Sequence, residues 1–152
     1  MMKTLRSLIA GREVYAIQKN VTVQDAAVYM TSKHIGAIPV LDGDRLVGIF
    51  SERDVINRVV SRGCEPMTTK VEDVMTRELV VASADESYES CLWKMKQAAC
   101  RHLPIVDEGR LLGVLSVRDL LMMEIDEKDE KIEFLQNYLF TVPGHAEKKY
   151  KA

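Results

Sequence analysis

The hydrophobic positions in the first half of the chain predict a regular order of strands and helices. Short apolar runs indicate strands over residues 14–17, 37–41 and 46–50. Apolar residues at helical spacing follow Thr22, which can cap a helix, and a second helix is expected over residues 51–60. Because the run at residues 46–50 is apolar nearly throughout, we expect that strand to be buried on both faces. The predicted order is β-α-β-β-α.

The second half of the chain repeats this pattern. Pro104 follows Pro39 by 65 residues, and many other positions match at the same offset. We expect strands over 79–81, 102–106 and 111–115, and helices that begin after Ser87 and Ser116. Turn signals at residues 42–44 and 107–109 join the last two strands of each copy, and each proline suggests an edge or a break in the strand ladder. The chain is therefore a tandem duplication, and we expect its two halves to share one core.

The pattern divides the chain into six segments. We expect an N-terminal helical segment over residues 1–11, a first repeat over 12–60, a linker over 61–78, a second repeat over 79–123, a helical extension over 124–140 and a tail over 141–152. The extension carries an apolar stripe among charged residues. The stripe is expected either to pack on its own domain or to form a dimer contact. The dimer is favoured because so small a unit has little surface left to cover the stripe.

Composition narrows the possible classes of function. The 152 residues are enough for one domain, and their formal net charge of -2 gives no basic excess for binding nucleic acid. No apolar run approaches the roughly 18 residues of a membrane span, and the first residues are too short for a signal peptide, so we expect a cytoplasmic protein. The cysteines form no CxxC motif. We expect reduced thiols, with Cys91 and Cys100 buried on the helix of the second repeat.

Both copies carry the same polar motif. It is Gly48-x-x-Ser51-x-Arg53-Asp54 in the first, and Gly113-x-x-Ser116-x-Arg118-Asp119 in the second. One interpretation is a capping box at the start of a helix. The other is a nucleotide site: the glycine admits a ligand to the backbone, the helix N-terminus and arginine favour phosphate, and the aspartate can accept two hydrogen bonds from a ribose diol. The two interpretations are compatible.

The duplication, the two motifs and the apolar-Pro-apolar-apolar-Asp strands resemble a tandem CBS-domain pair, also called a Bateman module, over residues 12–123. The whole chain looks like the small stand-alone bacterial CBS-pair proteins. The resemblance implies an α/β (α+β) fold with two tandem β-α-β-β-α repeats packed as one module, to which the sequence pattern adds an extended C-terminal helix. In that family the module binds adenine nucleotides (AMP, ADP, ATP, S-adenosyl compounds or NAD) and passes its occupancy on as a conformational change.

The resemblance also implies crossed pockets, in which the strand before the proline of one repeat faces the Ser-x-x-Asp of the other. The first pocket would be lined by Val14, Ile35, Gly36, Ala37, Ile38, Pro39, Ser116, Arg118 and Asp119. The second would be lined by Cys100, Arg101, His102, Leu103, Pro104, Ser51, Arg53 and Asp54. The aspartates would hold ribose, and the serines and arginines would hold phosphate. Arg101 and His102 are bulky, so the pocket that ends in Asp119 is expected to be the better adenosine site.

Several signatures of catalysis are missing from the sequence. It has no P-loop, no dinucleotide glycine motif, no metal-ligand cluster and no nucleophile elbow. We therefore expect a non-catalytic regulatory sensor of adenine nucleotides, with AMP or NAD favoured and no metal. It would act in trans on a partner protein or through its own homodimer, with no membrane or nucleic-acid partner. The alternative is a constitutive interaction protein, or scaffold, whose pockets are vestigial.

Overall fold

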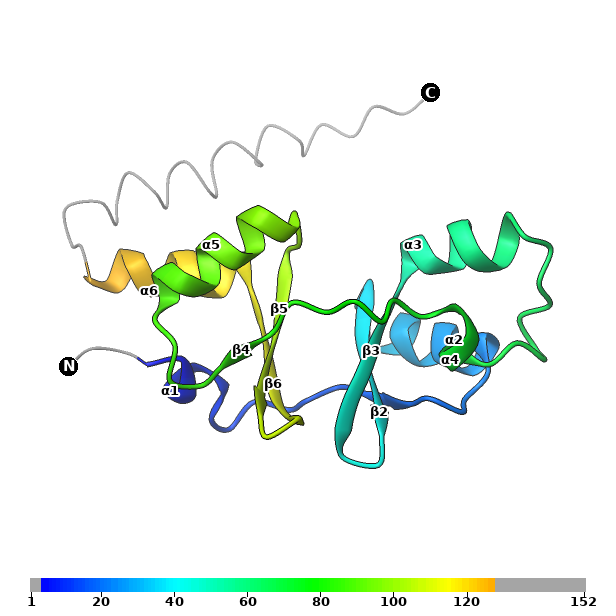
Figure 1. Ribbon diagram of the computed structural model, residues 1–152, viewed down its shortest axis with the longest axis horizontal. Helices are drawn as coiled ribbons and strands as arrows, with labels where there is room; N and C mark the ends of the chain where they lie inside the picture. Colours follow the sequence, from blue (N-terminus) through cyan, green and yellow to red (C-terminus); the bar gives the residue numbers. More distant parts are fainter. Residues whose placement is uncertain (1–3, 128–152) are drawn as a thin grey trace, which may run out of the picture.

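The structure is a computed structural model that describes residues 4–127 of the chain (Figure 1). Its helices are α1 (Leu5–Ile9), α2 (Val23–Lys33), α3 (Glu52–Asp54), the π-helical segment η1 (Val55–Val60), α4 (Val71–Val74), α5 (Tyr88–Ala98) and α6 (Val117–Glu127). Its strands are β1 (Ile17–Gln18), β2 (Ala37–Asp42), β3 (Arg45–Ser51), β4 (Ala82–Ser83), β5 (His102–Asp107) and β6 (Arg110–Ser116). The rest of the predicted helical extension, and the tail, lie outside the described residues. No described helix is long and apolar enough to cross a membrane.

The strands form one mixed sheet whose two halves have the same topology. The order is β1-β2-β3-β6-β5-β4. In each half an antiparallel hairpin is flanked by a short parallel strand, β1 beside β2 and β4 beside β5. The halves join where β3 and β6 pair at Arg45 and Arg110. Figure 1 shows a group of helices beside each hairpin, one group on either side of this junction. The predicted α/β (α+β) duplication is confirmed.

Local side-chain bonds explain where the long helices begin. The Thr22 hydroxyl accepts a hydrogen bond from the Asp25 amide at 3.1 Å, and the Ser87 hydroxyl accepts one from Ser90 at 3.2 Å. These bonds satisfy amides that the first turn of a helix leaves without a partner. Both hairpin turns are also as expected, and Glu108 and Gly109 have positive φ values of 48° and 82°, as a two-residue type I′ turn requires.

The first strand of each repeat is shorter than the sequence suggests, and it begins later. Strands were expected over residues 14–17 and 79–81, whereas β1 is Ile17–Gln18 and β4 is Ala82–Ser83. β1 pairs with β2 only from Val40 onward. The preceding residue of β2 is Pro39, which has no N–H to donate, so the parallel ladder ends there. Residues 14–16 instead run past the sheet toward the junction of the repeats.

The prediction of one shared core is wrong, because each repeat builds a core of its own. Phe50 lies in one cluster of buried side chains and Leu115 in the other. The leading helices are exchanged between the clusters: α1 precedes the first repeat but packs on the second, through Leu5, whereas α4 precedes the second repeat and packs on the first, through Val71. Because the two hairpins meet at a single strand pair, their buried faces do not form one continuous layer.

The return strand β3 is also buried differently from the prediction. Phe50 is fully buried, but Leu46, Val47 and Ile49 are only partly buried. One face of β3 packs on the helices of its own repeat. On the other side, Ile49 lies on the wall of a cavity between the two repeats.

Candidate functional site

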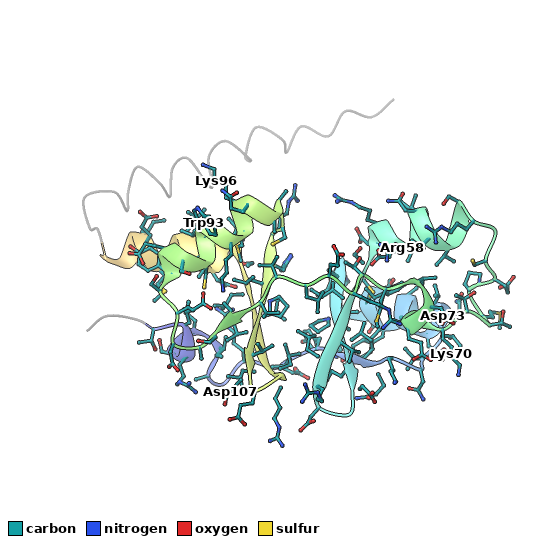
Figure 2. All side chains as sticks on the ribbon, in the orientation of Figure 1. Arg58, Lys70, Asp73, Trp93, Lys96 and Asp107 are labelled. Atoms are coloured by element: carbon teal, nitrogen blue, oxygen red, sulfur yellow. The ribbon has the colours of Figure 1, made fainter. Side chains whose placement is uncertain are left out.

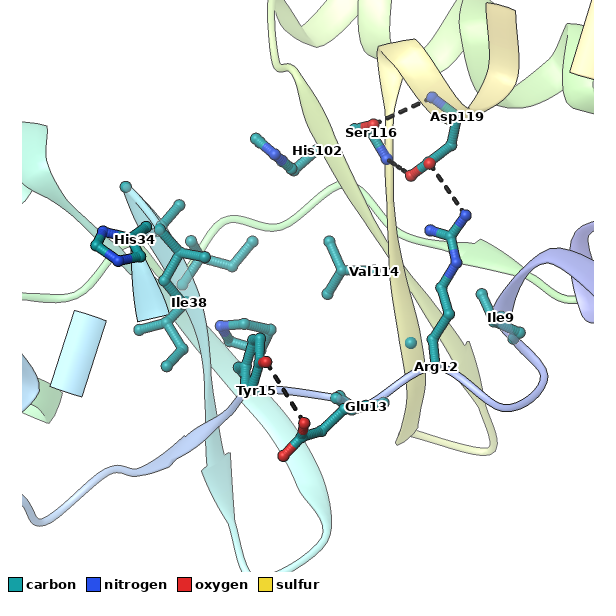
Figure 3. Close-up of a pocket in the computed structure, with 17 residues that line it drawn as sticks. Ile9, Arg12, Glu13, Tyr15, His34, Ile38, His102, Val114, Ser116 and Asp119 are labelled. Atoms are coloured by element: carbon teal, nitrogen blue, oxygen red, sulfur yellow. Dashed lines mark hydrogen bonds and ion pairs between the residues drawn. The ribbon is translucent and has the colours of Figure 1, made fainter. Parts of the chain in front are cut away.

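A cavity of about 440 Å³ lies between the two repeats (Figure 3). Its volume is in the range of pockets that hold small organic ligands. The walls come from the segment after α1, from the start of β2 and from β6 with the start of α6. The lining residues are Ile9, Arg12, Glu13, Val14, Tyr15, His34, Ile35, Gly36, Ala37, Ile38, Pro39, Ile49, His102, Gly113, Val114, Ser116 and Asp119. The lining combines eight apolar residues with polar and charged ones, among them Arg12, Glu13 and Asp119.

The structure brings together nearly all residues that were predicted for the first pocket. Eight of them line the cavity: Val14, Ile35, Gly36, Ala37, Ile38, Pro39, Ser116 and Asp119. Arg118 is exposed on α6 and is not among the lining residues. Arg12, Glu13 and Tyr15 line the cavity but were not predicted. The sequence held a signal for two of them, because Arg12-Glu13 is answered by Arg77-Glu78 at the same 65-residue offset.

Asp119 is held in place by the start of α6. The Ser116 amide donates to Asp119 Oδ2 at 2.8 Å, and the Asp119 amide donates to the Ser116 hydroxyl at 3.1 Å. The predicted capping box is therefore present. The other carboxylate oxygen, Oδ1, accepts a hydrogen bond from Arg12 Nη2 at 3.1 Å, as Figure 3 shows. The exposed fractions of the two side chains, 43% for Arg12 and 23% for Asp119, place the ion pair at the cavity edge.

The environment keeps Asp119 ionised. Partial burial by itself raises the pKa of this carboxyl. The hydrogen bond from Arg12 and those from Ser116 favour the charged form, and together they hold the pKa of Asp119 below its ordinary value. At neutral pH the cavity edge therefore carries a fixed carboxylate.

The opposite edge carries an aromatic ring. Tyr15 donates through its hydroxyl to Glu13 Oε2 at 3.4 Å. Its ring packs edge-on against Tyr29, with 6.4 Å between centroids, and Lys33 Nζ lies 5.1 Å from the centre of the Tyr15 ring. These contacts hold the ring of Tyr15 on the cavity wall.

Comparison with known families settles what the duplicated unit is. The sequence matches the CBS domain over residues 6–61 and again over residues 71–125. The chain belongs to the CBS-domain family. CBS-domain pairs are regulatory modules that often bind adenine nucleotides.

Relatives and solved structures agree with this assignment. The CBS domain-containing protein YhcV of Bacillus subtilis is 34% identical over 116 residues, which are 76% of this chain and 82% of YhcV. A solved protein with CBS domains from Burkholderia ambifaria is 33% identical with a TM-score of 0.72, over 83% of this chain and 96% of that chain. The CBS domain pair of protein MJ0100, in complex with 5′-methylthioadenosine and S-adenosyl-L-methionine, has a TM-score of 0.69 over 84% of this chain and 100% of that one. At 22% identity, this last likeness shows the fold alone.

The equivalent aspartate of the first CBS repeat has a different environment. Asp54 is only 5% exposed. One of its oxygens accepts from the Ser51 amide at 3.0 Å and from the Ser51 hydroxyl at 3.2 Å, and the other accepts from the Thr76 hydroxyl at 3.1 Å. Arg58 of η1 (Figure 2) lies 3.8 Å from Asp54 and donates to the Met75 carbonyl at 2.6 Å. Both aspartates use both oxygens within the protein, but the side chain of Asp54 is 8% exposed, against 23% for that of Asp119.

The residues that were predicted for the second pocket lie in several places. Cys100 and Arg101 line a smaller hollow of about 290 Å³ beside α5. His102, which the resemblance places in the second pocket, lines the large cavity instead. Leu103 and Pro104 are buried in β5, Ser51 and Asp54 form a capping box, and Arg53 is exposed on α3. A ligand site that unites these residues stays a prediction.

The glycines of the two motifs make room for the chain itself. A methyl group on Gly48 would lie 3.0 Å from the Thr76 carbonyl oxygen, and one on Gly113 would lie 2.9 Å from Cγ2 of Ile9. The segments after α4 and in α1 therefore cross the strands closely at these points. At Gly48 the space that we expected to admit a ligand is filled by Met75 and Thr76.

The cysteines are free thiols in different settings. Cys91 is buried in α5, as predicted. Cys100 lies beyond the end of α5 and is only partly buried, which corrects the prediction that both are buried on the helix. Among residues 4–127, no group of three or more His, Cys, Asp or Glu side chains is placed to hold a metal ion.

Proposed function

We propose that this chain is a regulatory module that binds an adenine nucleotide in the cavity between its CBS repeats and catalyses no reaction. The observation that carries the proposal is Asp119, an ionised carboxylate that the Ser116 amide holds on the cavity wall. A carboxylate accepts hydrogen bonds through both oxygens, so it can bind the two hydroxyls of a ribose. It is the matching group for the sugar of a nucleotide.

The remaining walls suit the base and the phosphate. Ile49 of β3 and Val114 of β6 are partly buried and line the cavity from opposite repeats, so a flat adenine ring can lie between apolar surfaces. Tyr15 adds an aromatic side chain to the cavity lining. The Ser116 hydroxyl stands just before the N-terminus of α6, where amide groups favour an anion. AMP, or the AMP half of NAD, combines a base, a ribose and a phosphate that suit these three regions of the cavity.

Binding at this place would change how the repeats sit against each other. They meet through one strand pair, and the cavity walls come from both of them. A ligand that touches both repeats stabilises the arrangement in which its contacts are complete. We propose that a partner protein, or the second subunit of a homodimer, responds to this arrangement.

Exposed apolar side chains support the homodimer. Ile56 and Val60 of η1 are 63% and 67% exposed, and Trp93 of α5 is 63% exposed. Figure 2 shows Trp93 on the outer side of its helix. An Ile56→Glu change is expected to convert a dimer to a monomer in sedimentation velocity, because it places a charge in an apolar contact. The cytoplasmic location stays a prediction.

A thermal-shift panel of AMP, ADP, ATP, NAD and S-adenosylmethionine tests the proposed function. Each ligand is added to the wild type, to Asp119→Ala and to the matched control Asp54→Ala. A ligand at about 100 times its Kd stabilises the folded state by about 2.7 kcal/mol. We expect at least one nucleotide to stabilise the wild type and Asp54→Ala equally, and to leave Asp119→Ala unchanged. If no nucleotide stabilises the wild type, the proposal fails and a constitutive scaffold takes its place.

A further inference from the structure

Arg12 has a special position in the cavity. It lies just after α1, and Figure 3 shows its side chain extending along the cavity edge to Asp119. Among the described residues that line the cavity, Arg12 is the one with a permanent positive charge. That charge is directed at the carboxylate, since Nη2 lies 3.1 Å from Asp119 Oδ1.

The ion pair competes with a ribose for the same acceptor. Asp119 Oδ2 already accepts from the Ser116 amide, and Oδ1 accepts from Arg12. A vicinal diol that binds Asp119 must therefore displace Arg12 from Oδ1 or share it. The displaced guanidinium then needs another anion. The adjacent carboxylate, Glu13, is bonded to the Tyr15 hydroxyl.

A phosphate on the same ligand supplies that anion. Arg12 is 43% exposed, so its side chain has room to turn away from Asp119 without a rearrangement of the core. A guanidinium binds phosphate through two parallel hydrogen bonds, which are stronger than bonds between neutral groups. A nucleotide can thus replace one internal ion pair by two ligand contacts, whereas a nucleoside only breaks the pair.

We propose that Arg12 is a specificity-determining residue: it forms an ion pair with Asp119 in the free protein and selects phosphorylated adenosine over adenosine. This inference rests on the proposed function, because it requires that the cavity bind adenine nucleotides. It adds that the cavity discriminates against unphosphorylated adenosine and that Arg12 is the residue responsible.

The linker between the repeats offers a matched control. Arg77 occupies the place equivalent to Arg12 at the 65-residue offset. Its guanidinium donates to the Glu72 carbonyl at 2.7 Å, whereas the equivalent aspartate, Asp54, is held by Ser51 and Thr76. Arg77→Gln removes the same charge from the protein without touching the Arg12–Asp119 pair.

The test is calorimetric titration of AMP and of adenosine into four proteins: the wild type, Arg12→Gln, Arg12→Lys and Arg77→Gln. In the wild type we expect AMP to bind at least about tenfold more tightly than adenosine, because a hydrogen bond to a charged group contributes that much. In Arg12→Gln we expect AMP to weaken about tenfold, while adenosine keeps its affinity or gains up to about fivefold, since an exposed ion pair is a weak competitor. Arg12→Lys should retain a preference for AMP, and Arg77→Gln should behave as the wild type.

Other results overturn the inference in distinguishable ways. If Arg12→Gln weakens AMP and adenosine by the same factor, Arg12 only shapes the pocket, and the proposed function stands. If AMP binding is unchanged in Arg12→Gln, Arg12 makes no phosphate contact, and again only the inference fails. If the wild type binds neither ligand, both fail. Thermal unfolding of Arg12→Gln, expected near the wild-type midpoint because the pair is exposed, shows that the variant is folded.

Discussion

Replacing Asp54 by alanine is expected to destabilise the protein more than replacing Asp119, although the two residues occupy equivalent places in the two repeats. Asp54 accepts hydrogen bonds from the Ser51 amide, the Ser51 hydroxyl and the Thr76 hydroxyl, and it is 5% exposed. The Asp54→Ala change leaves these three donors without their acceptor in a partly buried place. Asp119 has one bond from a backbone amide and an exposed ion pair with Arg12.

The two costs can be estimated from these contacts. Loss of a helix cap costs about 1 kcal/mol, and each buried donor left unsatisfied costs about 1–3 kcal/mol. These costs are not fully additive, because the donors are neighbours. We therefore expect Asp54→Ala to lower the free energy of unfolding by about 2–4 kcal/mol. For Asp119→Ala the cap contributes about 1 kcal/mol and the exposed ion pair at most about 1 kcal/mol, so we expect a loss of about 1–2 kcal/mol.

Urea unfolding at pH 7 without ligand measures the difference. The midpoints of the two variants are compared with that of the wild type, provided that the slope m is the same in all three. If Asp119→Ala lowers the free energy of unfolding as much as Asp54→Ala, the reasoning from burial and bond number is refuted. An equal loss would mean that Asp119 is as firmly built into the fold as Asp54, which would also weaken its assignment as an open ligand group.

Three further predictions concern other groups. The pKa of Asp119 is lowered in the folded state, so its ionised form stabilises the fold fully above the ordinary pKa of 3.8, and this stabilisation is lost as the pH falls further. The free energy of unfolding of Asp119→Asn, measured against pH, should therefore converge with that of the wild type in acid. Burial raises the pKa of the Cys91 thiol to about 11, so a thiol reagent at pH 8 should modify Cys64 before Cys91, as mass spectrometry of peptides would show. Gly48→Ala should cost about 1–3 kcal/mol in urea unfolding, because the added methyl group meets Thr76.

Much of the fold could be predicted because its signals are local. The caps at Thr22 and Ser87 act on amides three residues away, and the turns depend on the conformations of two residues. The predicted boundaries failed where pairing decides them. Ile17 belongs to a strand and residues 14–16 do not, because Pro39 ends the ladder on the neighbouring strand.

The candidate site could be predicted only in part. The resemblance placed the start of β2 opposite Ser116 and Asp119, and the structure brings these residues to one cavity. It gave no role to Arg12, although the Arg-Glu pair repeats in the sequence. The repeat marks Arg12 and Arg77 as equivalent, yet one contacts a carboxylate and the other a backbone carbonyl. A pattern in the sequence cannot distinguish these two contacts.

The sequence by itself determined the duplication, the order of elements in each repeat, and the polar motif that caps both helices. These depend on residues that are close along the chain, so their spacing specifies them. Only the tertiary structure decided that the repeats keep separate cores, that α1 and α4 pack on opposite repeats, and that Asp119 meets Arg12. Arg12 and Asp119 are 107 residues apart, and their contact depends on how the segment after α1 passes between the repeats. Asp54 is instead enclosed by Ser51 and Thr76 and is 5% exposed, whereas the side chain of Asp119 is 23% exposed at the cavity, so two similar motifs are chemically different.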